Sequence, residues 1–258
     1  MCTLVILRRP GHPWPLLLAA NRDEMLGRPW RPPGRHWPDR PYVVAGLDET
    51  AGGSWLGLND QGVVAGVLNR VDSLGPAEDK RSRGELVLEA LDHADAFAAA
   101  ESLADLNPAA YRSFNLVVAD NRDAYWLRNR AGEPGAPDCV EIFPLPTGLS
   151  MITARERNDT MSPRIRTHLP QFEAAAVPDP EAGNWEPWQR LLASRHHAVD
   201  QGPEAAMTIV TDAGFGTVSS SMIGLPEVPR SLRGEPPKPV WLFAPGSPDE
   251  ADYERVEV

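Results

Sequence analysis

The amino-acid sequence predicts an α+β fold, in which two sets of antiparallel strands form two inner sheets and helices lie outside them as a four-layer αββα sandwich. Two observations predict this class. Short β-branched and aliphatic runs recur along the chain, and adjacent runs are joined by turns such as Asn59-Asp60-Gln61-Gly62, whose composition is typical of hairpins. Only a few stretches have the apolar spacing of a helix.

The first two predicted strands bring the start of the chain next to residues 21–24. Residues 3–8 form an aliphatic run that begins directly after Cys2, and residues 16–20 form a second run after the turn at residues 11–15. Because the two runs should pair antiparallel, we expect residues 21–24 to return toward Cys2.

The next elements are a long connection, three strands and a helix. Residues 25–41 are rich in proline and predict a loop or lid without regular structure. Strands are expected over residues 42–45, 54–58 and 63–68, and the third strand brings Asn69 to its end. The Ser-x-x-Glu pattern at residues 82–85 resembles a capping box, and the apolar spacing after it predicts one helix over residues 83–104.

The rest of the chain completes the two strand sets. Further strands are expected over residues 114–119, 124–127, 140–143, 149–153, 208–211, 217–223 and 240–243, and helices over residues 158–172 and 185–199.

Length and composition fit a single domain spanning residues 1–258. The chain is 42% hydrophobic and 24% charged, which is ordinary for a soluble globular protein. Its net charge is −11 and it contains only two lysines, so neither nucleic acid nor an anionic membrane is an expected partner. The sequence does not predict an oligomeric state.

The cysteine content and the absence of long apolar stretches favour a cytoplasmic protein. Cys2 and Cys139 are too few for a disulfide framework, although one bond between them is possible. The apolar stretch of residues 16–20 is too short for a signal peptide, and no window approaches 18 apolar residues, so no membrane span is expected.

Cys2 is the strongest candidate for a catalytic residue. Removal of Met1 would leave Cys2 with a free α-amine beside its thiol, so that nucleophile and base belong to one residue. A thiol has an ordinary pKa of about 8.5 and an α-amine one of about 7.7–8.0, both near working pH. The alternative is that Cys2 is a small buried apolar residue.

Motifs spread over most of the chain support the catalytic interpretation. They are Met1-Cys2-Thr3, Asn21-Arg22-Asp23-Glu24, Ala51-Gly52-Gly53-Ser54-Trp55-Leu56-Gly57 with Asn69, Arg83-Gly84-Glu85-Leu86-Val87, Phe114-Asn115-Leu116, and Gly216-Thr217 followed by Ser219-Ser220. This set resembles the NRDE family, which is named for its Asn-Arg-Asp-Glu signature and includes the Transport and Golgi organization protein 2 relatives. The resemblance implies an N-terminal nucleophile hydrolase fold, a four-layer αββα sandwich with Cys2 as the processed nucleophile.

The chain is also distantly similar to the choloylglycine hydrolase and penicillin V acylase group, in which an N-terminal Cys acts with an Arg, an Asp and an Asn. Arg22, Asp23 and Asn69 occupy comparable places. In that group two residues separate the Arg from the Asp, whereas Arg22 and Asp23 are adjacent and would face opposite sides of a regular strand. The NRDE pattern also has an arginine where this chain has Val218.

The resemblance implies a role for each site residue. Asp23 would accept a hydrogen bond from the Cys2 α-ammonium, and Arg22 would stabilise the thiolate or orient Asp23; the alternative is a surface ion pair. Asn69 would donate its amide to the developing oxyanion, or is a turn residue at a strand end. Asn158 is a second donor candidate, with a helix N-cap as the alternative, and we assign it with Trp55 to substrate binding.

The sequence therefore predicts an N-terminal cysteine hydrolase that cleaves a non-peptide C–N amide bond of a small acylated or apolar molecule. No cofactor is expected, and the scattered histidines predict no metal site. The alternative is a non-catalytic carrier of haem or lipid on the same fold, since relatives are associated with haem mobilisation and with lipid or secretory homeostasis. A carrier would keep its ligand after Cys2→Ala, whereas a hydrolase would lose turnover.

Overall fold

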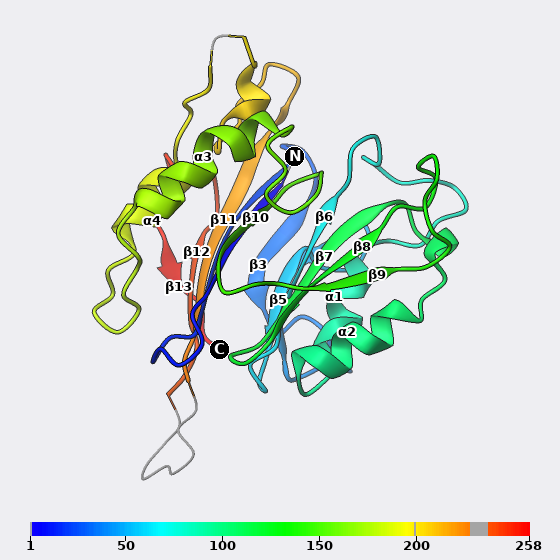
Figure 1. Cartoon of the computed structure of the whole chain (residues 1–258), viewed down its shortest axis with the longest axis horizontal. Coiled ribbons are helices and arrows are strands. Elements are labelled where there is room, and N and C mark those ends of the chain that lie inside the picture. The colour runs from blue at the N-terminus through cyan, green and yellow to red at the C-terminus, as the bar shows by residue number, and fades with distance from the viewer. Residues whose placement is uncertain (1, 199, 228–236) are drawn as a thin grey trace. The chain divides into compact units, whose positions relative to one another are not determined.

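Two antiparallel sheets organise the chain in the computed structural model, which describes residues 2–198, 200–227 and 237–258 (Figure 1). The chain divides into two compact units, one made of Met1–Arg28 and Pro146–Glu257 and the other of Pro29–Leu145 with Val258. Each unit contains one of the sheets and its own helices. The single domain over residues 1–258 stays a prediction.

The sheet of the first unit has six strands. Their order across the sheet is β10 (Gly148–Ile152), β1 (Thr3–Arg8), β2 (Leu16–Met25), β11 (Phe215–Leu225), β12 (Val240–Ala244) and β13 (Glu254–Arg255). Helices α3 (Pro163–Ala174) and α4 (Glu186–Leu192) pack on one face of this sheet, and a short 3-10 helix, η2 (Pro203–Ala205), precedes β11 (Figure 1). The core of this unit joins these helices to Val5, Leu7, Leu17, Ala19 and Met222, which alternate along the strands.

The first hairpin forms as predicted. β1 and β2 pair antiparallel with Thr3 opposite Asn21. β2 is longer than the predicted strand because β11 pairs with it along its whole length, from Leu16 to Met25. Residues 21–24 are therefore part of the strand and do not merely follow it.

The sheet of the second unit has seven strands. Their order follows the sequence: β3 (Trp30–Gly34), β4 (Val43–Asp48), β5 (Leu56–Asn59), β6 (Val64–Asn69), β7 (Phe114–Ala119), β8 (Ala124–Asn129) and β9 (Glu141–Pro144). Helices α1 (Gly84–Leu91) and α2 (Ala96–Ala104) pack on one face, against alternate residues such as Ala65, Leu116 and Leu127, and η1 (Pro108–Ala110) leads into β7.

One loop prediction and one strand prediction were wrong. The segment of residues 25–41 is not a loop throughout, because β3 pairs with β4, with Trp30 opposite Asp48. Proline is tolerated there since β3 is an edge strand and its pairing shifts register between Arg31 and Gly34. In contrast, residues 208–211 form no strand and make only a single bridge, from Val210 to Gly216.

The long helix predicted over residues 83–104 is two helices, α1 and α2. The break comes from local capping: Asp95 accepts a hydrogen bond from the Ala98 N–H at 2.8 Å and so starts a new helix. The predicted capping box is also wrong, because Arg83 occupies the N-cap position of α1 and its side chain makes no capping bond. Ser82 accepts from the Gly84 N–H at 3.2 Å instead.

The other two predicted helices are shorter than expected. Residues 158–172 become helical only at Pro163, because Ser162 is the N-cap and accepts from the Ile165 N–H at 3.4 Å. The helix predicted over residues 185–199 ends at Leu192, and residue 199 lies outside the described residues.

The backbones of Gly53 and Gly84 pack closely against each other, which explains why a glycine stands in each of the two motifs. A Cβ on Gly53 would lie 2.5 Å from the Gly84 carbonyl carbon, whereas Gly52 has open space and a φ of +72°. We expect Gly53→Ala to lower the free energy of unfolding by about 2–3 kcal/mol. Gly52→Ala, the control, should cost about 1 kcal/mol from its backbone conformation. Urea titrations measure both, and equal effects would contradict this account.

Candidate functional site

Cys2 lies immediately before β1, where its thiol contacts the backbone of Asp23 on the neighbouring strand. The Asp23 N–H donates to Cys2 Sγ over 3.4 Å, and the thiol donates to the Asp23 carbonyl over 3.5 Å. The prediction that the first hairpin returns residues 21–24 to Cys2 is therefore confirmed. Met1, whose removal is predicted, lies outside the described residues.

The surroundings of Cys2 favour a protonated thiol. Burial raises the pKa of the thiol above its ordinary value, and the nearby Asp23 carboxylate raises it further, while the Arg22 guanidinium acts in the opposite direction. Only the thiolate is a strong nucleophile. A reaction at Cys2 therefore needs a base close by that removes the thiol proton.

The Asp23 carboxylate is buried on the helix-covered face of the first sheet. Its Oδ2 accepts from Arg164 Nη1 of α3 at 2.9 Å, and its Oδ1 accepts from Thr217 Oγ1 of β11 at 2.7 Å. The side chains of Asp23 and Arg164 are 0% and 3% exposed. Arg164 Nη1 also donates to Thr3 Oγ1 at 2.7 Å. Thr3, which follows the nucleophile, and Asp23 therefore both accept from the same guanidinium.

Arg22 has other partners than its neighbour Asp23. Its Nη2 lies 3.9 Å from Glu24 Oε2, and Glu24 in turn lies 3.7 Å from Arg28 Nε. Arg22 and Glu24 are two residues apart and so share a face of β2, while Asp23 bonds to α3. This division follows the strand alternation expected for two adjacent residues.

Val218 occupies the extra position of an irregularity in β11. Thr217 pairs with Asp23 and Ser219 pairs with Arg22, so one more residue stands in β11 than in β2 at this point. Val218 is 8% exposed. A bulge of this kind re-aims the side chains around it, and here the neighbouring Thr217 bonds to the Asp23 carboxylate.

Asn21, the first residue of the Asn-Arg-Asp-Glu motif, ties together the segments that surround the site. Its Nδ2 donates to the carbonyls of Leu192 and Met207, each at 3.0 Å, and its Oδ1 accepts from Ser220 Oγ at 2.7 Å. These bonds hold the end of α4 and the segment before β11 against β2. We interpret Asn21 as a structural residue.

Asn158 lies beside the edge strand β10 in a left-handed conformation with a φ of 56°. Its Oδ1 accepts from the Met151 N–H at 2.6 Å, its own N–H donates to the Met151 carbonyl at 2.9 Å, and its Nδ2 lies 3.5 Å from the Leu149 carbonyl. The helix N-cap alternative was wrong, because Ser162 caps α3. A role of Asn158 in substrate binding stays a prediction. It would require the side chain to give up its bonds to β10 in favour of bonds to the substrate.

Asn69 and Trp55 belong to the second unit. Asn69 is the last residue of β6 and pairs with Phe114 of β7. The ring of Trp55 packs over Gly46, where a Cβ would lie 2.3 Å from it, and meets Trp30 edge to face at 5.8 Å. These contacts give Trp55 a structural role, and its assignment to substrate binding stays a prediction, as does the oxyanion role of Asn69.

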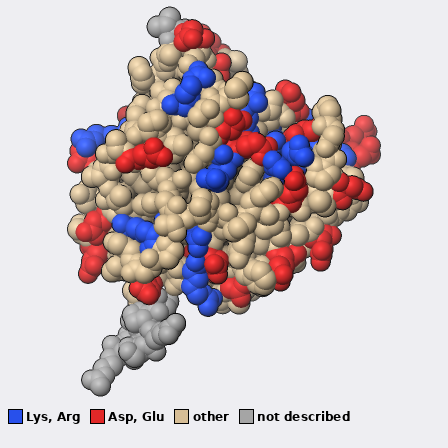
Figure 2. Space-filling model, in the orientation of Figure 1, with Lys and Arg blue, Asp and Glu red and all other residues tan. Residues whose placement is uncertain are grey.

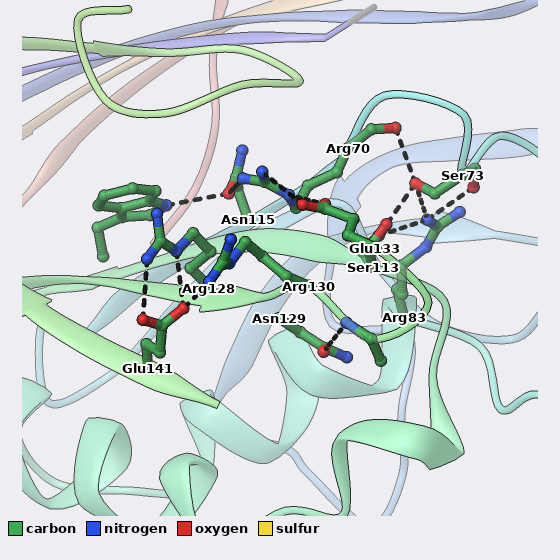
Figure 3. Close-up of polar contacts among 12 residues, drawn as sticks. Arg70, Ser73, Arg83, Ser113, Asn115, Arg128, Asn129, Arg130, Glu133 and Glu141 are labelled. Atoms are coloured by element: carbon green, nitrogen blue, oxygen red, sulfur yellow. Dashed lines mark hydrogen bonds and ion pairs between the residues drawn. The ribbon is translucent and has the colours of Figure 1, made fainter. Parts of the chain in front are cut away.

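A polar network, which the sequence did not predict, holds the chain that follows Asn69 (Figure 3). Arg70 is buried and donates to Asn115 Oδ1 at 3.0 Å and to Glu133 Oε1 at 2.8 Å. Arg83 Nη1 donates to the carbonyls of Ser73 and Ser113 at 2.8 and 3.0 Å. The network fixes the end of β6 and so constrains the position of Asn69.

Arg164 and Thr217 are the site residues that the sequence analysis missed. Thr217 lay within a recognised motif but had no assigned role. The sequence pattern of α3 could have indicated Arg164, because a charged residue stands there on an otherwise mostly apolar stripe. The buried residues of this helix are Arg164, Ile165, His168, Leu169 and Phe172. A charge at such a position indicates a buried partner.

His168, one turn after Arg164, makes the stability depend on pH. Burial and the charge of Arg164 lower its pKa to about 4. The unfolded histidine titrates near 6.5, so the unfolded chain binds the proton first and stability falls as pH drops from about 6.5 toward 4.

We expect the free energy of unfolding to fall by about 2 kcal/mol between pH 7.5 and pH 5 because of His168. Urea titrations of wild type and His168→Leu at both pH values measure this contribution. It should disappear in the variant, and an equal pH dependence in both proteins would contradict it.

Other expectations concern a disulfide, a metal site and a membrane span. Cys2 and Cys139 are both free thiols in the structure. Within residues 2–198, 200–227 and 237–258, no three His, Cys, Asp or Glu side chains are grouped so as to hold a metal ion. No helix in the same part of the chain is long and apolar enough to cross a membrane. On the face drawn in Figure 2, basic side chains lie among acidic ones.

Comparison with known sequences agrees with the resemblance seen in the motifs. The family model described as Transport and Golgi organisation 2 matches residues 1–222. The Transport and Golgi organization protein 2 homolog of Homo sapiens is 34% identical over 151 residues, which cover 52% of this chain and 50% of that protein. The Mus musculus homolog is 32% identical over the same shares. The match thus spans about half the length of these curated relatives.

Two solved structures with a similar fold are named as an amidase and as a conjugated bile acid hydrolase. The Caenorhabditis elegans ortholog of N-acylethanolamine-hydrolyzing acid amidase has a TM-score of 0.52 at 12% identity, covering 86% of this chain and 92% of that chain. A mutant of the conjugated bile acid hydrolase from Clostridium perfringens has a TM-score of 0.50 at 10% identity, covering 100% and 97%. The predicted α+β fold of the N-terminal nucleophile hydrolase type is therefore confirmed.

Proposed function

Because the chain belongs to the Transport and Golgi organisation 2 family and has the fold of the N-terminal nucleophile hydrolases, we propose that it is an amide hydrolase with Cys2 as nucleophile. Its substrate is a small molecule with an apolar acyl group joined by a non-peptide C–N amide bond. The observation that carries this proposal is the position of the Cys2 thiol, at the start of β1 and against the backbone of Asp23, whose carboxylate is buried and held from two sides.

The proposed reaction begins with removal of Met1, which gives Cys2 a free α-amine. That amine takes the thiol proton, and the thiolate attacks the amide carbonyl carbon. The C–N bond then breaks, the α-ammonium returns the proton to the leaving amine, and a thioester remains on Cys2. A water molecule, deprotonated by the same α-amine, hydrolyses the thioester to the free acid and restores the thiol.

Asp23 is proposed to orient the α-amine. Its two oxygens accept from Arg164 and Thr217, and a carboxylate has about four acceptor sites in all. These two bonds hold the carboxylate in a fixed position, in which it is proposed to accept from the ammonium of a processed Cys2. Asn69 remains the proposed oxyanion donor, and Arg22 is proposed to stabilise the thiolate, in line with the direction of its effect on the Cys2 thiol.

Exposed apolar side chains next to the motif support an apolar substrate. Met25 and Leu26, which follow Asp23 closely in the chain, are 49% and 63% exposed. Val210 is 54% exposed and bridges to Gly216, which pairs with Glu24 of the same strand. Leu26 is fixed by its N–H, which donates to the Gly214 carbonyl at 2.8 Å. Exposed apolar side chains in such a group are typical of a binding surface.

The test is release of free amine from a panel of N-acyl amides with acyl chains of increasing length. A hydrolase releases amine and acid in equal amounts, with efficiency that rises with chain length. Stoichiometric binding of haem or of the acyl compound with no release, unchanged by Cys2→Ala, would instead support the carrier alternative and contradict the proposal.

A further inference from the structure

Arg164 stands where the amphipathic pattern of α3 calls for an apolar residue. It follows the N-cap Ser162 and Pro163 and shares the buried stripe of the helix with Ile165 and Leu169. Its side chain is 3% exposed and pairs with a carboxylate that is 0% exposed. An ion pair buried this completely is weak evidence for stability, because apolar residues of similar volume often serve the fold equally well. The pair therefore suggests a role beyond packing.

The guanidinium of Arg164 connects three segments around the nucleophile. Nη1 donates to Asp23 Oδ2 at 2.9 Å and to Thr3 Oγ1 at 2.7 Å, and Nη2 donates to the Glu204 carbonyl at 3.0 Å. Thr3 is the residue after Cys2, and the backbone of Asp23 contacts the Cys2 thiol. A single side chain thus bonds both to β1, which Cys2 precedes, and to β2, whose backbone the Cys2 thiol contacts.

Charge compensation gives this geometry a chemical consequence. The Asp23 carboxylate disfavours loss of the Cys2 proton, since it raises the pKa of the thiol. An uncompensated carboxylate would also favour the protonated form of a neighbouring α-amine, which cannot act as a base. A cation 2.9 Å from the same carboxylate opposes both effects.

We propose that Arg164 is a positioning residue that fixes the Asp23 carboxylate beside Cys2 and compensates its charge, so that Cys2 can give up its proton. The part of this inference that concerns catalysis rests on the proposed function. The part that concerns the reactivity of the Cys2 thiol is independent of it. The charged and titratable groups that bear on the pair come from each element around it. They are Arg22 of β2, which acts on Cys2, His168 of α3, which interacts with Arg164, and His196 of the segment after α4, which interacts with His168.

The test measures the rate at which iodoacetamide labels Cys2 from pH 7 to pH 10, read by intact mass and peptide mapping. Cys139 of the same molecule is the internal reference, since it is exposed and belongs to the other unit. Arg164→Met removes the charge, Arg164→Lys keeps it, and the double variant Asp23→Asn with Arg164→Met removes both charges. Circular dichroism checks that each variant is folded.

We expect Arg164→Met to slow labelling of Cys2 by about three-fold or more at pH 8 and to move the whole profile to higher pH. Arg164→Lys and the double variant should return to the wild-type profile, and labelling of Cys139 should not change. A wild-type profile in folded Arg164→Met would overturn the inference. A double variant as slow as Arg164→Met would also overturn it, because the effect would then not pass through Asp23.

If Arg164→Met does not fold, the variant Asp23→Asn provides the test. It removes the carboxylate and keeps the guanidinium, so Cys2 should label faster than in wild type, and an unchanged or slower rate contradicts the inference. Labelling needs neither substrate nor removal of Met1. If the labelling rates shift as expected but no amide is hydrolysed, the proposed function alone is refuted. If amides are hydrolysed but the labelling rates do not shift, the role of Arg164 alone is refuted.

Discussion

Replacing Cys2 by alanine is expected to abolish amide hydrolysis, with a loss of about 10⁴-fold or more in kcat/KM. The reason is that the proposed acyl-enzyme forms on this thiol, so that no other group takes over its step. The half-buried thiol contacts the Asp23 backbone through long hydrogen bonds of 3.4 and 3.5 Å, whose loss costs little, so the variant should remain folded. The measurement is amine release from the best substrate of the N-acyl amide panel.

Cys139→Ala is the matched control for this experiment. Cys139 is exposed and lies in the second unit, between β8 and β9, so its loss should leave kcat/KM unchanged. Equal activity of Cys2→Ala and wild type would refute the nucleophile assignment. Equal losses in both variants would indicate general damage to the protein and would contradict the assignment as well.

Replacing Asp23 by alanine is expected to lower the free energy of unfolding by about 3–5 kcal/mol. Arg164 would keep its buried charge but lose the carboxylate, and the Thr217 hydroxyl would lose an acceptor at 2.7 Å. Removal of one partner of a buried pair costs far more than removal of both, since the remaining charge stays desolvated. Urea titration measures the change.

The double variant Asp23→Leu with Arg164→Met is the control for this second prediction. It replaces both charges by apolar side chains, so it should be much closer to wild type in stability than Asp23→Ala. A double variant that is as unstable as Asp23→Ala, or an Asp23→Ala protein as stable as wild type, would contradict the description of a buried ion pair at this site.

The start of the site was predictable because it is local. An aliphatic run after Cys2, a proline-containing turn and a second aliphatic run leave few ways to pair, and β1 and β2 pair with Thr3 opposite Asn21. Alternation along β2 then separates Arg22 from Asp23. Contact between Cys2 and Asp23 therefore followed from spacing within the first 25 residues of the chain.

The partners of Asp23 were not predictable from such spacing. Arg164 and Thr217 lie 141 and 194 residues away in the sequence, and they reach Asp23 only because α3 packs on the sheet and β11 pairs with β2. Periodicity predicts elements but not which distant elements meet. The irregularity at Val218 was equally hidden, because a change of register is a property of two paired strands.

Two of the wrong element predictions have a common physical cause. Apolar spacing ran through residues 83–104 and predicted one helix, yet capping by Asp95 starts a second helix. Proline content predicted a loop over residues 25–41, yet an edge strand with a shifted register tolerates proline in β3. In both places particular hydrogen bonds, the Asp95 cap and the β3–β4 pairing, determine the structure, whereas the prediction used the average composition or spacing of the segment.

The most direct test of the central claim is the intact mass of the purified chain combined with brief exposure to limiting iodoacetamide near neutral pH and peptide mapping. We predict a mass that lacks Met1 and labelling of Cys2 well before Cys139, because a processed Cys2 has its own base beside the thiol. A chain that retains Met1, or a Cys2 that reacts no faster than Cys139, would contradict the proposal that Cys2 is a primed N-terminal nucleophile.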